Sequence, residues 1–154
     1  MNILIAIDFS AITSAVLATV SELVEASGDK NLHLHLMHVA EPDPEFVGWD
    51  TGPDVVQEQV AKEGRRAEEK LEGLATELRS ATGAAVTTLF VRGPIAETVH
   101  SQAKELEARM IIVGSHGHGA AYNLVIGSIS AAIVKESGVP VLIVPDPDND
   151  RTGD

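Results

Sequence analysis

Residues 110–130, MIIVGSHGHGAAYNLVIGSIS, carry the strongest indication of the fold in this chain. The apolar run Met110–Val113 predicts a short strand buried on both faces. Three glycines follow within six residues, and the pair Gly127–Ser128 then opens a stretch that predicts a helix to about Ser137. A strand, a glycine-rich loop and a helix in this order are typical of a ligand-binding turn at the carboxyl edge of a parallel sheet.

The rest of the chain alternates in the same way between short apolar runs and longer amphipathic ones. Four more apolar runs predict strands at Ile3–Ile7, Leu32–Val39, Ala85–Val91 and Val139–Val144. Helical spacing of apolar residues predicts three more helices, ending at Gly28, at Gly83 and at about Leu106. This strict alternation predicts a single α/β domain, with a five-stranded parallel sheet and helices on both faces.

Local chemistry sets the expected helix starts. Ser10 or Thr13 is expected to cap the first helix, because a side-chain oxygen at that place accepts from a free backbone amide. Pro94 is expected at the first helical position of the third helix. Asp8, at the end of the first strand, is also of a residue type that caps helices routinely.

Composition narrows the classes of function. The chain has 154 residues, no cysteine, and 11 basic against 23 acidic residues, for a net charge of −12. This balance argues against nucleic acid and against an anionic membrane surface as partners, and the missing cysteines exclude disulfides and thiolate metal sites. No basic leader and no apolar stretch of about 18 residues is present. We expect a soluble cytoplasmic domain over residues 1–145, without membrane insertion, and a flexible acidic tail over 146–154.

The glycine-rich loop predicts an anion site. Successive backbone amides in such a loop form a nest for an anion, and the amides at Gly127 add the positive end of a helix dipole. Ser128 and Ser130 supply hydroxyl donors without charge. No Gly-Lys pair occurs, and the turn Asp8–Thr13 has no glycine, so neither a Walker loop nor a dinucleotide fingerprint is present.

The spacing Gly114-x2-Gly117-x9-Gly127-Ser128 resembles the signature of the universal stress protein family, in its ATP-binding branch. The resemblance extends over nearly the whole chain, through Ile5–Ser10, Met37–Val39, Gly93–Ile95 and Val139–Pro145. It implies a doubly wound sheet with strand order 3-2-1-4-5, a homodimer, and ATP as ligand. We expect Mg²⁺ or Mn²⁺ on the phosphates of the ATP.

The resemblance also implies roles for individual residues. Asp8 would meet the adenosine end of the nucleotide, Val39 would contact adenine through its backbone, and Ala6 stands where many members have proline. The other implied contacts lie in the loop and the helix start: Gly114, Ser115, His116, Gly117, His118, Gly119, Gly127, Ser128, Ile129 and Ser130. His118 occupies a place often taken by Lys or Arg, so a fixed positive charge is lost there, and a divalent cation is expected to compensate.

We therefore expect an ATP-binding module that regulates or senses in the stress response, with an unidentified protein partner and no assigned catalytic residue. Two alternatives stay open. One is a slow ATP hydrolase in which His116 or His118 acts as acid or base. The other is a dimeric interaction module that binds no nucleotide. Asp8 as a phosphoacceptor, and metal ligation by the histidines at 33, 35 and 38 or at 116 and 118, are weaker readings, and no metal site is predicted.

The last predicted strand explains why a dimer is expected. In the implied order Val139–Val144 lies at a sheet edge, where a long apolar strand promotes aggregation unless it is covered. Pairing with the same strand of a second copy covers it with twofold symmetry. The acidic segment Glu41–Glu58 is consistent with a solvated surface, a lid, a partner contact or adaptation to salt, and its sequence does not rank these.

Overall fold

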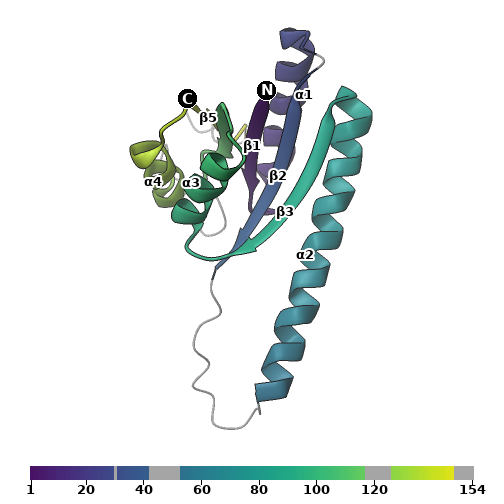
Figure 1. Cartoon of the computed structure of the whole chain (residues 1–154), viewed down its shortest axis with the longest axis vertical. Helices are drawn as coiled ribbons and strands as arrows, with labels where there is room; N and C mark the ends of the chain where they lie inside the picture. Colours follow the sequence, from purple (N-terminus) through teal and green to yellow (C-terminus); the bar gives the residue numbers. More distant parts are fainter. Residues whose placement is uncertain (30, 42–52, 117–125, 148–154) are drawn as a thin grey trace, which may run out of the picture.

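The computed structural model describes residues 1–29, 31–41, 53–116 and 126–147. Five parallel strands form one sheet in the order β3-β2-β1-β4-β5, as predicted (Figure 1). In chain order the elements are β1 Asn2–Ile7, α1 Thr13–Ser27, β2 His33–Ala40, α2 Pro53–Thr82, β3 Ala85–Arg92, α3 Ile95–Glu105, β4 Met110–Gly114, α4 Ser128–Glu136 and β5 Val141–Val144. The doubly wound α/β architecture is therefore confirmed.

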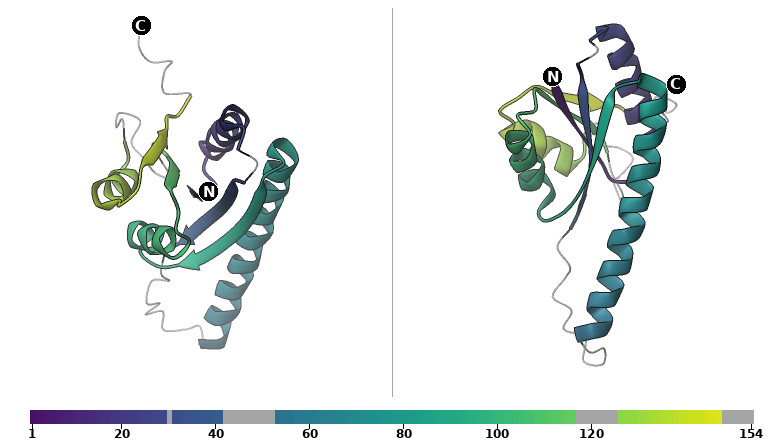
Figure 2. Two further views of the ribbon diagram at one scale, coloured as in Figure 1. Left: turned by 45° about the horizontal axis from the view of Figure 1, so that its top comes forward. Right: turned by 45° about the vertical axis from the view of Figure 1, so that its right-hand side comes forward.

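The sheet has a helical layer on each side, and each layer closes its own core (Figure 2). On one side α1 and α2 pack against strand residues such as Ile5 and Leu36. On the other side α3 and α4 pack against Leu4, Met37 and Val113. Residues Ile3 to Ile5 have no exposed surface at all, because successive side chains of a central strand enter opposite cores. This burial is the physical reason for the continuous apolar runs in the sequence.

Helix α2 has 30 residues and runs along β3, extending past the end of the sheet at its N-terminal end (Figure 1). Arginines tie α2 to the edge strand at two places. Arg79 donates from Nε and Nη2 to the carbonyl of Val86, at 3.1 and 2.8 Å, and Arg92 Nη2 donates to the carbonyl of Val60 at 3.1 Å. Among the described residues, no helix combines the length and apolar character needed to cross a membrane.

Two predicted element starts are wrong. Pro94 is the N-cap of α3 rather than its first helical residue, and its carbonyl accepts the first helical hydrogen bond, from Thr98 N. Strand β5 begins at Val141, not Val139, because Val139 is held in a turn by Ser137 and Pro140 has no N–H to donate.

The predicted cap of α1 is also wrong. Ile12 occupies the N-cap position and no side chain caps the helix. The hydroxyl of Ser10 is engaged by Asp8 Oδ1 instead, and Thr13 lies inside the first turn, with its N–H donated to the carbonyl of Ser10. Helix α2 starts at Pro53, inside the acidic segment Glu41–Glu58, and residues 42–52 of that segment lie outside the described residues.

Candidate functional site

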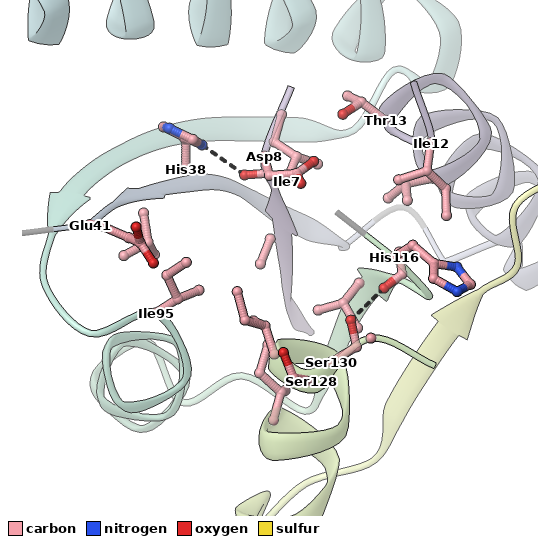
Figure 3. Close-up of a pocket in the computed structure, with 18 of the residues that line it drawn as sticks. Ile7, Asp8, Ile12, Thr13, His38, Glu41, Ile95, His116, Ser128 and Ser130 are labelled. Atoms are coloured by element: carbon pink, nitrogen blue, oxygen red, sulfur yellow. Dashed lines mark hydrogen bonds between the residues drawn. The ribbon is translucent and has the colours of Figure 1, made fainter. Parts of the chain in front are cut away.

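A cavity of about 690 Å³ opens at the carboxyl edge of the sheet, where β1, β2 and β4 end (Figure 3). Its position follows from the topology. The chain leaves β1 toward one face and β4 toward the other, so a crevice forms between the two strand ends. The starts of α1, α3 and α4 contribute Thr13, Ile95 and Ser128 to its wall.

The structure brings most of the predicted site residues to this cavity. The described lining residues that were predicted are Ala6, Asp8, Val39, Gly114, His116, Gly127, Ser128, Ile129 and Ser130. Ser115 is not among the lining residues: it is buried, its N–H donates to the carbonyl of Val144, and its hydroxyl bonds His116 Nδ1 at 2.9 Å. Gly117, His118 and Gly119 lie outside the described residues.

The start of α4 supplies the polar wall. Gly127 is the N-cap, its N–H donates to the carbonyl of Ser115 at 2.7 Å, and its own carbonyl accepts from Ala131 N. The amides of the first three helical residues, 128 to 130, have no acceptor within the helix. No acidic residue stands in this first turn, so the positive end of the helix dipole is not neutralised locally. The arrangement suits an anionic group of a ligand.

The two serines of this turn differ in what they offer. Ser128 is exposed, and its side chain lies at the cavity wall (Figure 3). Ser130 is buried, and its hydroxyl donates to the carbonyl of Gly114 at 2.8 Å. Ser130 therefore ties α4 to the end of β4, and its hydroxyl proton is committed to that contact rather than to a ligand.

The described glycines of the motif are required for close approach. A Cβ on Gly114 would lie 2.7 Å from Ile12 Cγ2, and one on Gly127 would lie 3.3 Å from the carbonyl oxygen of Ser115. Neither residue has a positive φ. Both positions are therefore glycine because of close packing and not because of backbone conformation: Gly114 lies against the Ile12 side chain, and Gly127 lies against the backbone of Ser115.

Asp8 is held by a tight turn after β1. Its Oδ1 accepts hydrogen bonds from Ser10 N, at 3.0 Å, and from the hydroxyl of Ser10. The residue between them, Phe9, has a φ of 59°. A bulky side chain rarely adopts this left-handed conformation, so contacts around Phe9 must hold it there.

Sequence reasoning missed half of the cavity wall. The apolar members are Ile7, Ile12, Val16, Ala40, Val113, Ile95 and Ile133, and the polar ones are Thr13, His38 and Glu41. The apolar residues are ordinary core residues by pattern, and only their places at strand ends and helix starts mark them. Thr13 is 7% exposed, and among the described residues its Oγ1 has no hydrogen-bond partner.

The histidines of β2 form no metal site in the described part of the chain. His33 and His35 stack on one face, with ring centroids 4.3 Å apart, and His35 Nδ1 bonds Thr87 Oγ1 at 2.7 Å. Burial, together with the neighbouring charge of His33, lowers the pKa of His35 below its usual value. No group of three or more candidate ligands occurs among the described residues. Metal binding by His116 together with His118 stays an untested alternative, because residue 118 lies outside the described residues.

Known proteins share this fold. The Universal stress protein family matches residues 1–145. The universal stress protein YxiE of Bacillus subtilis is 30% identical over 148 residues, covering 93% of this chain and 97% of the relative. Among solved structures, the hypothetical protein MJ0577 superposes with a TM-score of 0.81 at 26% identity, and each chain is covered to 96%.

A third relative carries a bound ligand. The universal stress protein from Archaeoglobus fulgidus, solved in complex with dAMP, has a TM-score of 0.58 at 22% identity, covering 94% of this chain and 97% of its own. At that identity it supports the fold alone. The family match over residues 1–145, the strand order and the relatives agree. The chain belongs to the universal stress protein family.

Proposed function

We propose that this protein is an adenine-nucleotide-binding regulatory module, with ATP as its ligand. The observation that carries the proposal is the cavity at the strand ends, which is apolar at one side and lined by the free amides of α4 at the other. A nucleotide has the same division between a flat apolar base and an anionic phosphate chain. The dAMP bound by the Archaeoglobus fulgidus relative is of this chemical class.

In this proposal the nucleotide lies in one direction along the cavity. The base fits the end of β2, where Val39, Ala40 and Ile95 line the cavity. Asp8, at the end of β1, stands at the ribose and adenosine end, because a carboxylate accepts from hydroxyls. The phosphates then reach the start of α4, at Ser128 and Ile129.

A divalent cation fits this site for an electrostatic reason. The described lining residues include the carboxylates of Asp8 and Glu41 and no Lys or Arg. The chain has a net charge of −12, so its overall electrostatic potential does not attract a negatively charged triphosphate. Mg²⁺ or Mn²⁺ on the phosphate oxygens would supply the missing positive charge. We assign binding and not turnover, and therefore no catalytic residue.

Substitution of Ser128 tests the phosphate end with a matched pair. Ser128→Glu puts a negative charge at the first helical residue of α4, which favours the helix but repels a phosphate. Ser128→Gln has almost the same shape without the charge. By calorimetric titration with Mg-ATP, Ser128→Glu should lose about tenfold or more in affinity relative to Ser128→Gln, at equal or higher melting temperature. Equal affinities of the two variants would remove the start of α4 as the phosphate site.

We also propose a homodimer formed through β5. In a parallel ladder alternate residues face the neighbouring strand, and the bonds from Ile111 N to the carbonyl of Pro140 and from Ser115 N to that of Val144 fix which ones face β4. Val141 and Ile143 therefore direct their backbone groups to the open edge. Val134, on the adjacent helix α4, is 44% exposed, which adds apolar surface near that edge.

Light scattering coupled to gel filtration tests the dimer. Wild type should elute with twice the chain mass of 16.2 kDa, whereas Ile143→Pro, which removes one outward N–H, should elute as a monomer. A monomeric wild type contradicts the proposed dimer.

A further inference from the structure

His38 touches the chain on both sides of Asp8 without being part of the predicted nucleotide contacts. It lies near the end of β2, in register with Ile7 of β1. Its Nδ1 is 2.9 Å from the carbonyl oxygen of Ile7, the residue before Asp8 (Figure 3). Because a carbonyl oxygen only accepts, Nδ1 carries the proton in this contact.

The ring of His38 holds the residue on the other side of Asp8. The ring centroids of Phe9 and His38 are 4.4 Å apart, and Lys70 Nζ lies 5.5 Å from the centroid of the Phe9 ring. The Phe9 ring is therefore fixed between β2 and α2. This packing accounts for the left-handed backbone at Phe9, with its φ of 59°.

The opposite side of His38 is also packed. The Phe90 ring of β3 lies parallel to it, 6.0 Å between centroids at 20°, and the Arg92 guanidinium lies 5.5 Å from the centroid of Phe90. Two aromatic rings, each with a cation near its face, thus pack against the imidazole. A residue held so firmly, and bonded to the chain beside Asp8, is suited to setting the direction of the Asp8 carboxylate.

We propose that His38 is a positioning residue for the nucleotide site: its Nδ1–H fixes Ile7 and its ring fixes Phe9, so that the turn between them directs Asp8 toward the ligand. The inference rests on the proposed function, since it requires Asp8 to contact the nucleotide. His38 acts through Asp8, so its effect on binding disappears when the Asp8 carboxylate is removed.

Two substitutions separate the two contacts of His38. His38→Asn keeps an N–H donor at the place of Nδ1 but loses the ring, whereas His38→Phe keeps the ring but loses the donor. His35→Phe, on the same strand but outside the cavity lining, is the matched control. In calorimetric titrations with Mg-ATP, each His38 variant should weaken binding by about three- to tenfold, and the control should leave it unchanged.

The decisive step repeats the His38 variants in an Asp8→Ala background. There, neither substitution should change the remaining affinity by more than about twofold, because nothing is left to position. The same loss with and without Asp8 would overturn the inference, as would wild-type affinity in both single His38 variants. Neither of these two results would contradict the proposed nucleotide site.

A second readout needs no nucleotide. Ser10 N donates to Asp8 Oδ1, so exchange of the Ser10 amide hydrogen, followed by NMR, reports whether the carboxylate keeps its place. Exchange should be faster in His38→Phe than in wild type and in His35→Phe. Unchanged exchange would overturn the positioning role. If wild type binds no Mg-ATP at all, the proposed function fails, and the Ser10 exchange still decides whether His38 places Asp8.

Discussion

Substitution of two glycines by alanine should have opposite effects on stability. At Gly114 the new Cβ would lie 2.7 Å from Ile12 Cγ2 and 3.1 Å from its Cδ1. Cγ2 branches directly from the Cβ of Ile12, which is 5% exposed, so the contact cannot be relieved by movement of a side-chain end. At Gly73, in the exposed middle of α2, a Cβ meets nothing within 4 Å.

The expected magnitudes follow from packing and helix propensity. Forcing an extra methyl into a filled core costs about 1–3 kcal/mol, whereas replacing Gly by Ala in an open helical position gains about 0.5–1 kcal/mol. For a domain of this size each kcal/mol shifts the melting temperature by about 2–4 °C. Gly114→Ala should therefore melt several degrees below wild type and Gly73→Ala slightly above it.

Urea unfolding followed by circular dichroism measures both free energies, and a double substitution identifies the cause. Ile12→Leu moves the branch away from the backbone at nearly constant volume, so it should recover about 1 kcal/mol or more in the Gly114→Ala background. Because Ile12 lines the cavity, Gly114→Ala should also weaken Mg-ATP binding. A Gly114→Ala protein as stable as wild type would refute the packing explanation of the motif.

Two further predictions concern buried polar groups. Because the pKa of His35 is lowered in the folded protein, the unfolded chain binds a proton at a higher pH than the folded protein does. The free energy of unfolding is therefore unaffected by His35 above pH 6.5, the ordinary imidazole pKa, and decreases as the pH falls below 6.5. The loss in melting temperature between pH 7.5 and 5.5 should be smaller for His35→Gln than for wild type, and equal losses would contradict this. Thr13→Val removes a buried hydroxyl that has no described partner, so the nucleotide-free protein should gain about 1 kcal/mol in urea unfolding. A clear loss of stability would show that the hydroxyl is satisfied.

The sequence predicts best the strands that are buried on both faces, because burial requires an apolar residue at every position. The runs at Ile3–Ile7 and Met110–Val113 are apolar at every position because both faces of the sheet are covered, so strand type and order of elements are readable. Gly28 and Gly83 were correctly read as helix ends, since both adopt the left-handed conformation, at φ 62° and 68°.

The parts that sequence reasoning missed depend on contacts between distant segments. Ser10 looks like a helix cap by type, but Asp8 takes its hydroxyl, and the cap position falls to Ile12. By sequence His38 is one of three histidines on a strand, and only the structure shows its register with Ile7 and its contact with the Ile7 carbonyl. The glycine signature predicted residues that line the cavity, whereas the apolar wall of the cavity consists of core residues that no local pattern distinguishes.

The central claim is that the cavity at the strand ends holds an adenine nucleotide. The most direct measurement is to purify the protein without added nucleotide, denature it, identify any released small molecule by chromatography and mass, and titrate Mg-ATP into the emptied and refolded protein. We expect ATP or another adenine nucleotide in the released fraction or, if that fraction is empty, saturable binding of Mg-ATP. An empty protein that gives no binding signal with Mg-ATP would contradict the account and leave a family member that works without nucleotide.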